Sequence, residues 1–132
     1  MQARDIMTRQ VITIGPEATV FELAELLTRQ HISGVPVLDS SGRLVGVATH
    51  ADVIIKTGAS VAEVMTPNPI TVREEAPLEE VAMILAGHHI KRVPVMRGDT
   101  LVGLVSRADI VRAVARRAWR PDHIVDYELS LT

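Results

Sequence analysis

The chain has 132 residues, of which 47% are hydrophobic and 23% are charged, and its formal net charge is −2. This balance excludes a disordered chain, and the absence of cysteine excludes a disulfide scaffold and a zinc site built from thiolates. No apolar run approaches the roughly 18 residues of a membrane span, and a pI of about 6.2 offers no uniformly basic surface for duplex DNA. The lack of cysteine and of a leader pattern after Met1 predicts a cytoplasmic protein.

The two halves of the chain repeat each other at an offset of 58 residues. Short identities occur in the same order in both halves: Met7-Thr8 with Met65-Thr66, His31-Ile32 with His89-Ile90, and Val35-Pro36-Val37 with Val93-Pro94-Val95. After a one-residue gap near residues 39–43, Ala51-Asp52 matches Ala108-Asp109. The chain is therefore a duplication, which we divide into residues 1–58, residues 59–118 and a tail over 119–132.

Each copy begins with a short β-branched run, at 11–14 and at 70–72, which predicts a strand. A helix follows, because Thr19 opens a capping-box pattern in the first copy and Pro77 occupies the expected first helical position in the second. Apolar runs at 35–38 and 44–48 flank a turn sequence and predict a hairpin, which 93–96 and 101–105 repeat. A second helix is expected to open at Thr49 and again at Ser106.

A unit of about 55 residues buries too little apolar surface to be stable by itself. We therefore expect an α+β fold in which two tandem β-α-β-β-α repeats pack sheet to sheet with pseudo-twofold symmetry. A further capping pattern from Ser60 to Glu63 predicts a helical turn before the second repeat, equivalent to residues 2–6 before the first. Beyond the repeats, Pro121 is expected to end the last helix, and residues 124–131 suggest an extended segment.

No pattern in the sequence points to catalysis or to a metal. The chain has no Gly-x-Ser-x-Gly motif, no glycine-rich phosphate loop and no pair of histidines at helical i, i+4 spacing. His88 and His89 are adjacent, so on a helix they would point about 100° apart and would not chelate one ion. We expect no enzyme activity, no metal and no required cofactor.

A polar motif recurs where a strand passes into a helix in each copy. Thr49 with Asp52, and Ser106 with Asp109, both fit the pattern Gly-h-h-[Ser/Thr]-x-x-Asp, where h is apolar. A Ser or Thr followed three residues later by an acid is a helix N-cap signature that needs no ligand. The same geometry offers helix N–H groups to an anion and a carboxylate to ribose hydroxyls, so both interpretations stay open.

The two copies differ in charge at the entrance of the Val-Pro-Val strand. Lys91 and Arg92 occupy this place in the second copy, where the first has Ser33 and Gly34. A solvated basic pair is the simplest interpretation. The difference also predicts two related clefts with unequal affinity for anions.

Three motifs together carry a family resemblance: Met-Thr-x-x-x-Ile-Thr, His-x-x-x-h-Pro-Val and Gly-h-h-[Ser/Thr]-x-x-Asp. Each copy resembles a cystathionine-beta-synthase-type (CBS) domain, and the two over residues 2–117 resemble a Bateman module. The resemblance implies a three-stranded sheet and two helices per copy, with two clefts between the copies. It also implies adenosine-containing ligands such as AMP, ADP, ATP, S-adenosylmethionine or NAD.

The resemblance further implies which residues form each cleft. The first cleft would combine Thr49 and Asp52 with Ile70, Lys91, Arg92 and Pro94. The second would combine Ser106 and Asp109 with Ile12, Ser33, Gly34 and Pro36. By resemblance, the aspartates would take ribose hydroxyls, the Thr and Ser hydroxyls would contact phosphate or ribose, and the strand backbones at 12 and 70 would read the adenine edge. Val35 or Val93 would pack on the adenine faces, and the cations of the first cleft favour a phosphorylated ligand there.

We therefore expect a non-catalytic adenine-nucleotide sensor that forms a homodimer through its helices and acts in trans on a protein partner. Two other classes stay open. In one, the repeats serve only dimerisation or protein binding, although intact acids in both copies favour a ligand. In the other, nucleic acid binds an arginine-rich segment: Arg107, Arg112, Arg116, Arg117 and Arg120. A solvated basic face near a helix C-terminus is the simpler account of these arginines.

Overall fold

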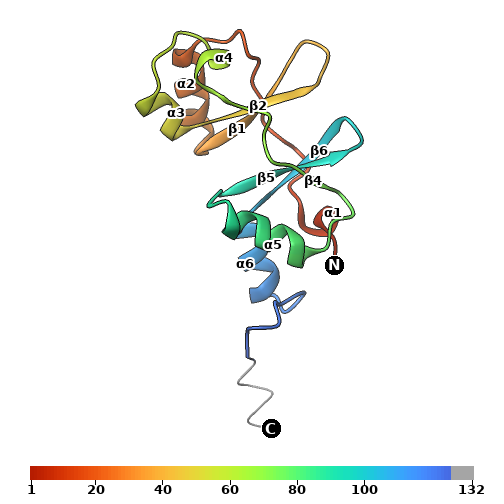
Figure 1. The fold of residues 1–132 in the computed structure, drawn as a ribbon. Coiled ribbons are helices and arrows are strands. Elements are labelled where there is room, and N and C mark those ends of the chain that lie inside the picture. Colours follow the sequence, from red (N-terminus) through yellow and green to blue (C-terminus); the bar gives the residue numbers. More distant parts are fainter. Residues whose placement is uncertain (126–132) are drawn as a thin grey trace.

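The computed structural model describes residues 1–125. Its elements follow one another as α1 Ala3–Ile6, α2 Val20–Gln30, β1 Gly34–Leu38, β2 Leu44–Thr49, α3 His50–Ile55, α4 Val61–Val64, β3 Thr66–Pro67, β4 Val72–Arg73, α5 Leu78–Gly87, β5 Arg92–Arg97, β6 Thr100–Ser106 and α6 Arg107–Ala115. The strands form two three-stranded sheets, ordered β1-β2-β3 and β4-β5-β6. The predicted α+β fold with two alike halves is confirmed. In Figure 1 the halves lie one above the other, and both hairpins project to the same side.

The first sheet is built on the hairpin of β1 and β2. Gly34 pairs with Thr49 at the open end of this hairpin, and the two strands run antiparallel to the turn. Asp39 organises the turn, because its Oδ1 accepts hydrogen bonds from the backbone N–H groups of Ser41 and Arg43, both at 2.9 Å. β3 lies antiparallel along the other side of β2.

The second sheet repeats this hairpin with β5 and β6. Arg92 pairs with Ser106 at the open end, and Gly98 takes a left-handed φ of 57° in the turn. β4 lies parallel to β5, with Val72 opposite Val95. The open ends of both hairpins therefore carry the residues that the sequence analysis assigned to ligand binding.

Each half takes its opening helical turn from the other repeat. α1 lies against the second half, where the N–H of Ala3 donates to the carbonyl of Ala76 at 2.8 Å. α4 lies against the first half, where the N–H of Val61 donates to the carbonyl of Ala18 at 2.8 Å. The residues that follow these turns also lie against the other repeat. β3, after α4, pairs with β2 of the first half, and Thr8, after α1, forms a bridge to β6 of the second half. The boundaries 1–58 and 59–118 describe the sequence repeats and remain a prediction. The packed halves do not follow them, because α1 lies against the second half and α4 against the first.

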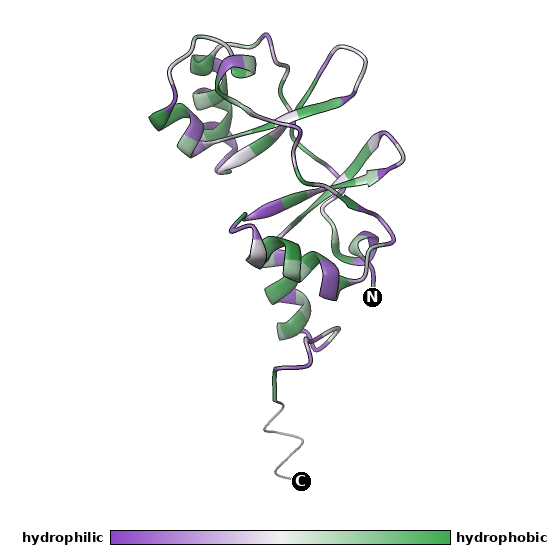
Figure 2. Cartoon of the chain, in the orientation of Figure 1, coloured by the Kyte–Doolittle hydropathy of each residue, from purple (hydrophilic) through white to green (hydrophobic). Residues whose placement is uncertain are grey.

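Aliphatic side chains fill a separate core in each half. The first core includes Leu23, Val35 and Val61, and the second includes Ala3 and Val93, all fully buried. Each core thus contains a residue from the exchanged turn, and burying one aliphatic side chain contributes about 1.5–3 kcal/mol. Figure 2 shows the hydrophobic residues gathered along the helices and strands of both halves.

The predicted helix starts agree with the structure, and the strand ends differ slightly. Thr19, Thr49 and Ser106 are the N-caps of α2, α3 and α6. Pro77 is the N-cap of α5 and not its first helical residue, a shift of one position. The strand predicted over 11–14 is reduced to one parallel bridge of Ile14 with β1. The strand predicted over 70–72 is shorter and later, as β4 Val72–Arg73, and shares only Val72 with the prediction.

The last helix ends earlier than predicted. Its C-cap is Arg116, and Arg117 has a left-handed φ of 55°. The N–H of Ala118 donates to the carbonyl of Ala113 at 2.9 Å, which completes a Schellman turn, so the prediction that Pro121 ends this helix is wrong. The extended segment predicted over 124–131 lies almost entirely outside the described residues.

Candidate functional site

Two reciprocal caps join a strand to a helix, one in each half. In the first half, Asp52 Oδ2 accepts from the backbone N–H of Thr49 at 2.8 Å and from its hydroxyl at 3.2 Å. In the second half, Asp109 Oδ2 accepts from the N–H of Ser106 at 2.8 Å, and the N–H of Asp109 donates to the Ser106 hydroxyl at 3.1 Å. Both acids are buried, at 5% and 8% exposure. The capping interpretation is therefore correct, and it leaves one oxygen of each carboxylate for another partner.

A cation from the same helix occupies that other oxygen. Lys56 Nζ lies 2.9 Å from Asp52 Oδ1, and Arg112 Nη1 lies 2.9 Å from Asp109 Oδ1. The two cationic side chains are 42% and 51% exposed, whereas the acids are buried. Because an exposed ion pair is worth only about 0.2–1 kcal/mol, either cation can leave its acid at small cost. The sequence analysis missed both pairs, although their i, i+4 and i, i+3 spacings were visible.

Arg92 reaches from the second half across to the first. Its Nη2 donates to the hydroxyl oxygen of Ser33. Gly34 makes room for it, since a Cβ built on Gly34 would overlap the Arg92 guanidinium and lie 3.0 Å from Thr49 Cγ2. Ser33, Gly34, Thr49 and Arg92 are therefore together at the open end of the first hairpin, next to the cap of Asp52.

The charge on Arg92 has no carboxylate partner. The ion pairs within residues 1–125 join Lys56 to Asp52, Arg97 to Glu74 and Arg112 to Asp109, and none of them includes Arg92. Burial lowers the pKa of the Arg92 guanidinium below its ordinary value, but an arginine stays charged at any physiological pH. A half-buried cation with only a hydroxyl partner favours an anion beside it.

The structure shows to which half each predicted site residue belongs. Ser33, Gly34 and Ile12, which the sequence analysis assigned to the second cleft, lie in the same half as Thr49, and their assignment to a cleft stays a prediction. The N–H of Ile14 donates to the carbonyl of Pro36 at 3.1 Å, which sets the residues around Ile12 beside β1. Ile70 precedes β4, which pairs with β5, so it lies in the half of Ser106 and not in that of Thr49.

The valines and prolines of the predicted site lie inside the cores. Val35 and Val93 are fully buried, and Pro36 and Pro94 are also buried. Their side chains are not exposed in this structure, so the packing of Val35 or Val93 on an adenine face stays a prediction.

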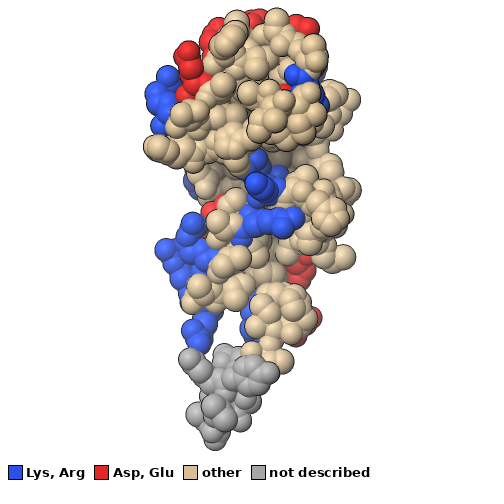
Figure 3. All heavy atoms as spheres, turned by 90° about the vertical axis from the view of Figure 1, so that its left-hand side faces the viewer, with Lys and Arg blue, Asp and Glu red and all other residues tan. Residues whose placement is uncertain are grey.

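The arginine-rich segment is largely used within the fold. Arg107 Nε donates to the carbonyl of Ile90 at 2.9 Å, and its Nη2 to that of Leu85 at 3.0 Å, where α5 ends. Arg112 is paired with Asp109, and Arg120 lies beyond the end of α6. The helical stripe that a nucleic acid would follow is thus interrupted. Figure 3 shows Lys and Arg side chains at the waist between the halves and along one side of the lower half.

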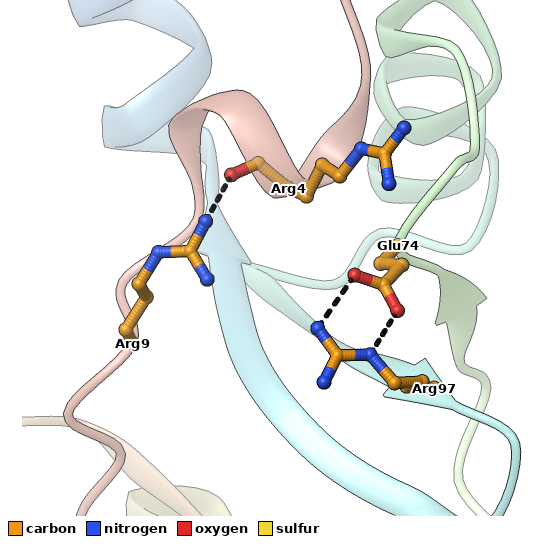
Figure 4. A network of polar contacts seen from close by, with 4 residues as sticks. All are labelled: Arg4, Arg9, Glu74 and Arg97. Carbon is orange, nitrogen blue, oxygen red and sulfur yellow. Dashed lines mark hydrogen bonds and ion pairs between the residues drawn. The ribbon is translucent and has the colours of Figure 1, made fainter.

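A second polar network, which the sequence analysis did not detect, fastens α1 to the second half. Glu74, with 5% exposure, accepts from Arg97 Nε at 2.5 Å and from Arg97 Nη2 at 3.1 Å (Figure 4). This pairing lowers the pKa of the Glu74 carboxyl below its ordinary value of 4.5. The carbonyl of Glu74 accepts from the N–H of Arg4, and Arg9 Nη2 donates to the carbonyl of Arg4.

Comparison with known proteins identifies the family. A model of the CBS domain matches residues 3–56 and again 61–116. The chain belongs to the CBS domain family. Stand-alone CBS pairs related to this chain are regulatory ligand-binding modules and not enzymes, which is what the sequence analysis expects of this chain. Within residues 1–125 no helix combines the length and the apolar character needed to cross a bilayer.

Among its relatives, CBS domain-containing protein YhcV of Bacillus subtilis is 32% identical over 114 residues, which are 81% of each chain. Inosine-5'-monophosphate dehydrogenase of Methanocaldococcus jannaschii is 31% identical over 114 residues, which are 84% of this chain and 23% of that one. CBSX2 of Arabidopsis thaliana, solved in complex with AMP, has a TM-score of 0.84 and 28% identity, covering 89% of this chain and 98% of that one. The CBS pair of MJ0100, solved with 5'-methylthioadenosine and S-adenosyl-L-methionine, has a TM-score of 0.82 and 30% identity, with 89% and 98% covered.

Proposed function

We propose that this CBS pair binds an adenosine-type ligand that carries a phosphate, and that the bound state regulates a partner protein in trans. The binding residues are Ser33, Gly34, Thr49, Asp52 and Arg92, which we call the Arg92 site. A second, equivalent site is expected around Ser106 and Asp109 in the other half.

The half-buried charge of Arg92 is the observation that carries this proposal. Withdrawing a cation from water without a counter-ion is unfavourable, and among residues 1–125 the Arg92 side chain has only the Ser33 hydroxyl as a hydrogen-bond partner. A phosphate supplies the missing negative charge and matches the planar guanidinium with two parallel hydrogen bonds. Lys91, exposed and next in the chain, adds a further cation at the same place.

Asp52 supplies the group that suits a ribose. A carboxylate oxygen accepts hydrogen bonds from vicinal hydroxyls, as acidic residues do in dinucleotide-binding folds. Asp52 Oδ2 is committed to the cap of α3, so a ribose has to take Oδ1 from Lys56. In the second half, Arg112 holds the equivalent oxygen of Asp109. The ligand therefore competes with a cation of the protein at each site.

The similar structures support the ligand class. AMP, 5'-methylthioadenosine and S-adenosyl-L-methionine, the molecules bound to CBSX2 and MJ0100, share an adenosine unit. They differ in charge at the 5' position, which is where a site containing Arg92 is expected to discriminate. We infer a preference for AMP or a longer 5'-phosphate over the uncharged or cationic derivatives.

Thermal unfolding in the presence of AMP, ATP, S-adenosylmethionine and adenosine tests the proposal, with GMP as the matched control for the base. A ligand at a hundredfold excess over its Kd adds about 2.7 kcal/mol to the free energy of unfolding. We expect stabilisation by AMP or ATP, less by adenosine and none by GMP. Equal stabilisation by AMP and GMP, or none by any adenosine compound, would contradict the proposal.

A homodimer is the second part of the proposed function. Five large apolar side chains on the helices are exposed: Phe21, Ile54, Ile55, Met83 and Val111. Ile54 and Val111 occupy equivalent positions in the two repeats, at 80% and 66% exposure. Exposed apolar patches mark interaction surfaces, so these helices are expected to meet those of a second copy. The same faces would serve a protein partner if the chain were an interaction module without a ligand.

A further inference from the structure

A second cleft lies at the other end of the hairpins, away from the Arg92 site. Its volume is about 560 Å³, and it is lined by the turn of the first hairpin, the turn of the second hairpin and the segment that joins the two halves. Arg92 begins β5 and the turn of that hairpin follows Arg97, so the length of the strand separates the two places by about 17 Å. We call this region, defined by Arg43, Asn68, Thr71, Arg73 and Asp99, the hairpin-turn cleft.

Two arginines give the hairpin-turn cleft its charge. Arg43 comes from the first half and Arg73 from the second, and Asp99 is the one acid in the lining. Neither Arg43 nor Arg73 forms an ion pair in the part of the chain that the structure describes. The neighbouring Arg97, by contrast, is neutralised by Glu74. The lining of the cleft thus carries a net positive charge of one.

The fold does not require these arginines. After the one-residue gap Arg43 corresponds to Thr100, and at the offset of 58 Arg73 corresponds to Gly15, so the repeat carries no cation at either equivalent position. Thr71, in contrast, corresponds to Thr13, as expected of a position that serves the fold in both copies. The charge of the hairpin-turn cleft, to which both halves contribute, is therefore independent of the duplication.

We propose that the hairpin-turn cleft binds a small organic anion with a carboxylate or a phosphate group. A guanidinium matches either group with two hydrogen bonds, and Asn68 and Thr71 add neutral hydrogen-bonding groups. A volume of about 560 Å³ lies within the 300–1,000 Å³ common for small-molecule sites.

The remaining lining narrows the class of ligand. Leu44, Val72 and Met96 provide an apolar wall, which suits a ligand with a short hydrocarbon body. Asp99 repels a dense negative charge, so a monoanion or dianion fits better than a polyphosphate or a nucleic acid. Arg43 and Arg73 are exposed, so water and salt screen their charges. We therefore expect a Kd in the millimolar range.

Nuclear magnetic resonance of the ¹⁵N-labelled full chain, at constant ionic strength, tests the proposal with four probes. Glutarate and phenyl phosphate carry the two anionic groups, and glutaramide and phenol are their uncharged counterparts. We expect saturable shifts at the amides of Leu44, Thr71 and Gly98 with glutarate, with phenyl phosphate or with both, and none with the uncharged probes. The probe that binds more tightly identifies the carboxylate or the phosphate as the preferred group.

A matched pair of double variants completes the test. Arg43→Gln with Arg73→Gln is expected to weaken binding of the anionic probe at least tenfold. Arg29→Gln with Arg116→Gln removes the same charge from exposed helix ends and is expected to leave the affinity unchanged. The proposal is overturned if neither anion produces saturable shifts at these amides, if the shifts occur only around Ser33 and Thr49, or if both double variants bind alike.

Discussion

Lys56 lies 2.9 Å from the one oxygen of Asp52 that the cap of α3 leaves available. The Arg92 site is therefore closed to a ribose by a cation of its own helix, and opens when that cation turns to solvent. Arg112 plays the same part for Asp109 in the second half. This arrangement gives the two caps a second role, in which a cation of the same helix balances the charge of the carboxylate until a ligand replaces it.

Lys56→Ala is expected to raise the affinity for adenosine at the Arg92 site by about two- to fivefold, because the ion pair that competes with the ribose is worth about 0.2–1 kcal/mol. Adenosine is the suitable probe, since it has no phosphate that would respond to the lost charge. Calorimetric titration measures the change. Arg112→Ala is the control and is expected to act only on the site of Asp109. No gain at the Arg92 site in Lys56→Ala, or the same gain at that site in Arg112→Ala, would show that Lys56 does not restrain Asp52.

Asp52→Asn separates binding from capping. The amide oxygen still accepts from the N–H of Thr49, so the free energy of unfolding is expected to fall by no more than about 1 kcal/mol. The charged acceptor for ribose is lost, and the affinity for adenosine should fall about tenfold. Titration and chemical denaturation of the same variant provide both values. An unchanged affinity with a lower melting temperature would mean that the acid only caps its helix.

Gly34→Ala tests the space that Arg92 occupies. A Cβ at this position overlaps the guanidinium, so the Arg92 side chain has to leave Ser33. The preference for AMP over adenosine is expected to shrink severalfold, while the backbone keeps its extended form. Gly87→Ala, at a position with no atom within 4 Å of the new Cβ, is the control. A preserved preference in Gly34→Ala would place the phosphate away from Arg92.

Glu74→Gln tests the network that fastens α1. The pairing with Arg97 lowers the pKa of Glu74 in the folded state, so its stabilisation is present above the ordinary value of 4.5 and is lost as the pH falls through the folded value. The variant should be less stable than the natural chain at pH 7, and the difference should be smaller at pH 3. Urea denaturation at both pH values measures this, with the exposed neighbour changed by Glu75→Gln as control. A difference independent of pH would assign the effect to packing.

Ile54→Glu with Val111→Glu tests the dimer. Light scattering is expected to give twice the chain mass of 14.4 kDa for the natural sequence and the single mass for the double variant. Glu25→Lys with Arg29→Glu, which changes charges on α2 without adding one to an apolar site, is expected to leave the mass unchanged. A natural chain that scatters as a monomer at high micromolar concentration would contradict the predicted assembly.

The sequence predicted those parts of the fold that depend on neighbours along the chain. The hairpins follow from apolar runs around turn residues, and α2, α3 and α6 begin at Thr19, Thr49 and Ser106 because a cap is a local hydrogen bond. The exchange of α1 and α4 between the halves could not be predicted from the sequence. It depends on backbone hydrogen bonds such as that from Ala3 to Ala76, which leave no periodic pattern.

The candidate site was predicted as a set of residues but not as an arrangement. The repeat comparison singled out Lys91 and Arg92 against Ser33 and Gly34, and the structure places Arg92 in direct contact with Ser33. The backbone of Arg92 pairs with Ser106, but its guanidinium lies in the other half near Thr49, with which the sequence analysis grouped it; the assignment of the remaining residues to clefts stays a prediction. A single sequence shows the charge of a long side chain and leaves its direction open. The predicted inequality of the two clefts stays a prediction.

The ratio of affinities for AMP and adenosine, measured by calorimetry on the natural chain and on Arg92→Ala, tests the central claim most directly. A charge-assisted hydrogen bond to phosphate contributes about 1.5–3 kcal/mol, or about ten- to a hundredfold in affinity. We expect AMP to bind the natural chain at least tenfold more tightly than adenosine does, and we expect this affinity ratio to fall close to one in Arg92→Ala. Added salt should lower the same ratio in the natural chain. An Arg92→Ala variant that binds AMP with the natural affinity would contradict the account.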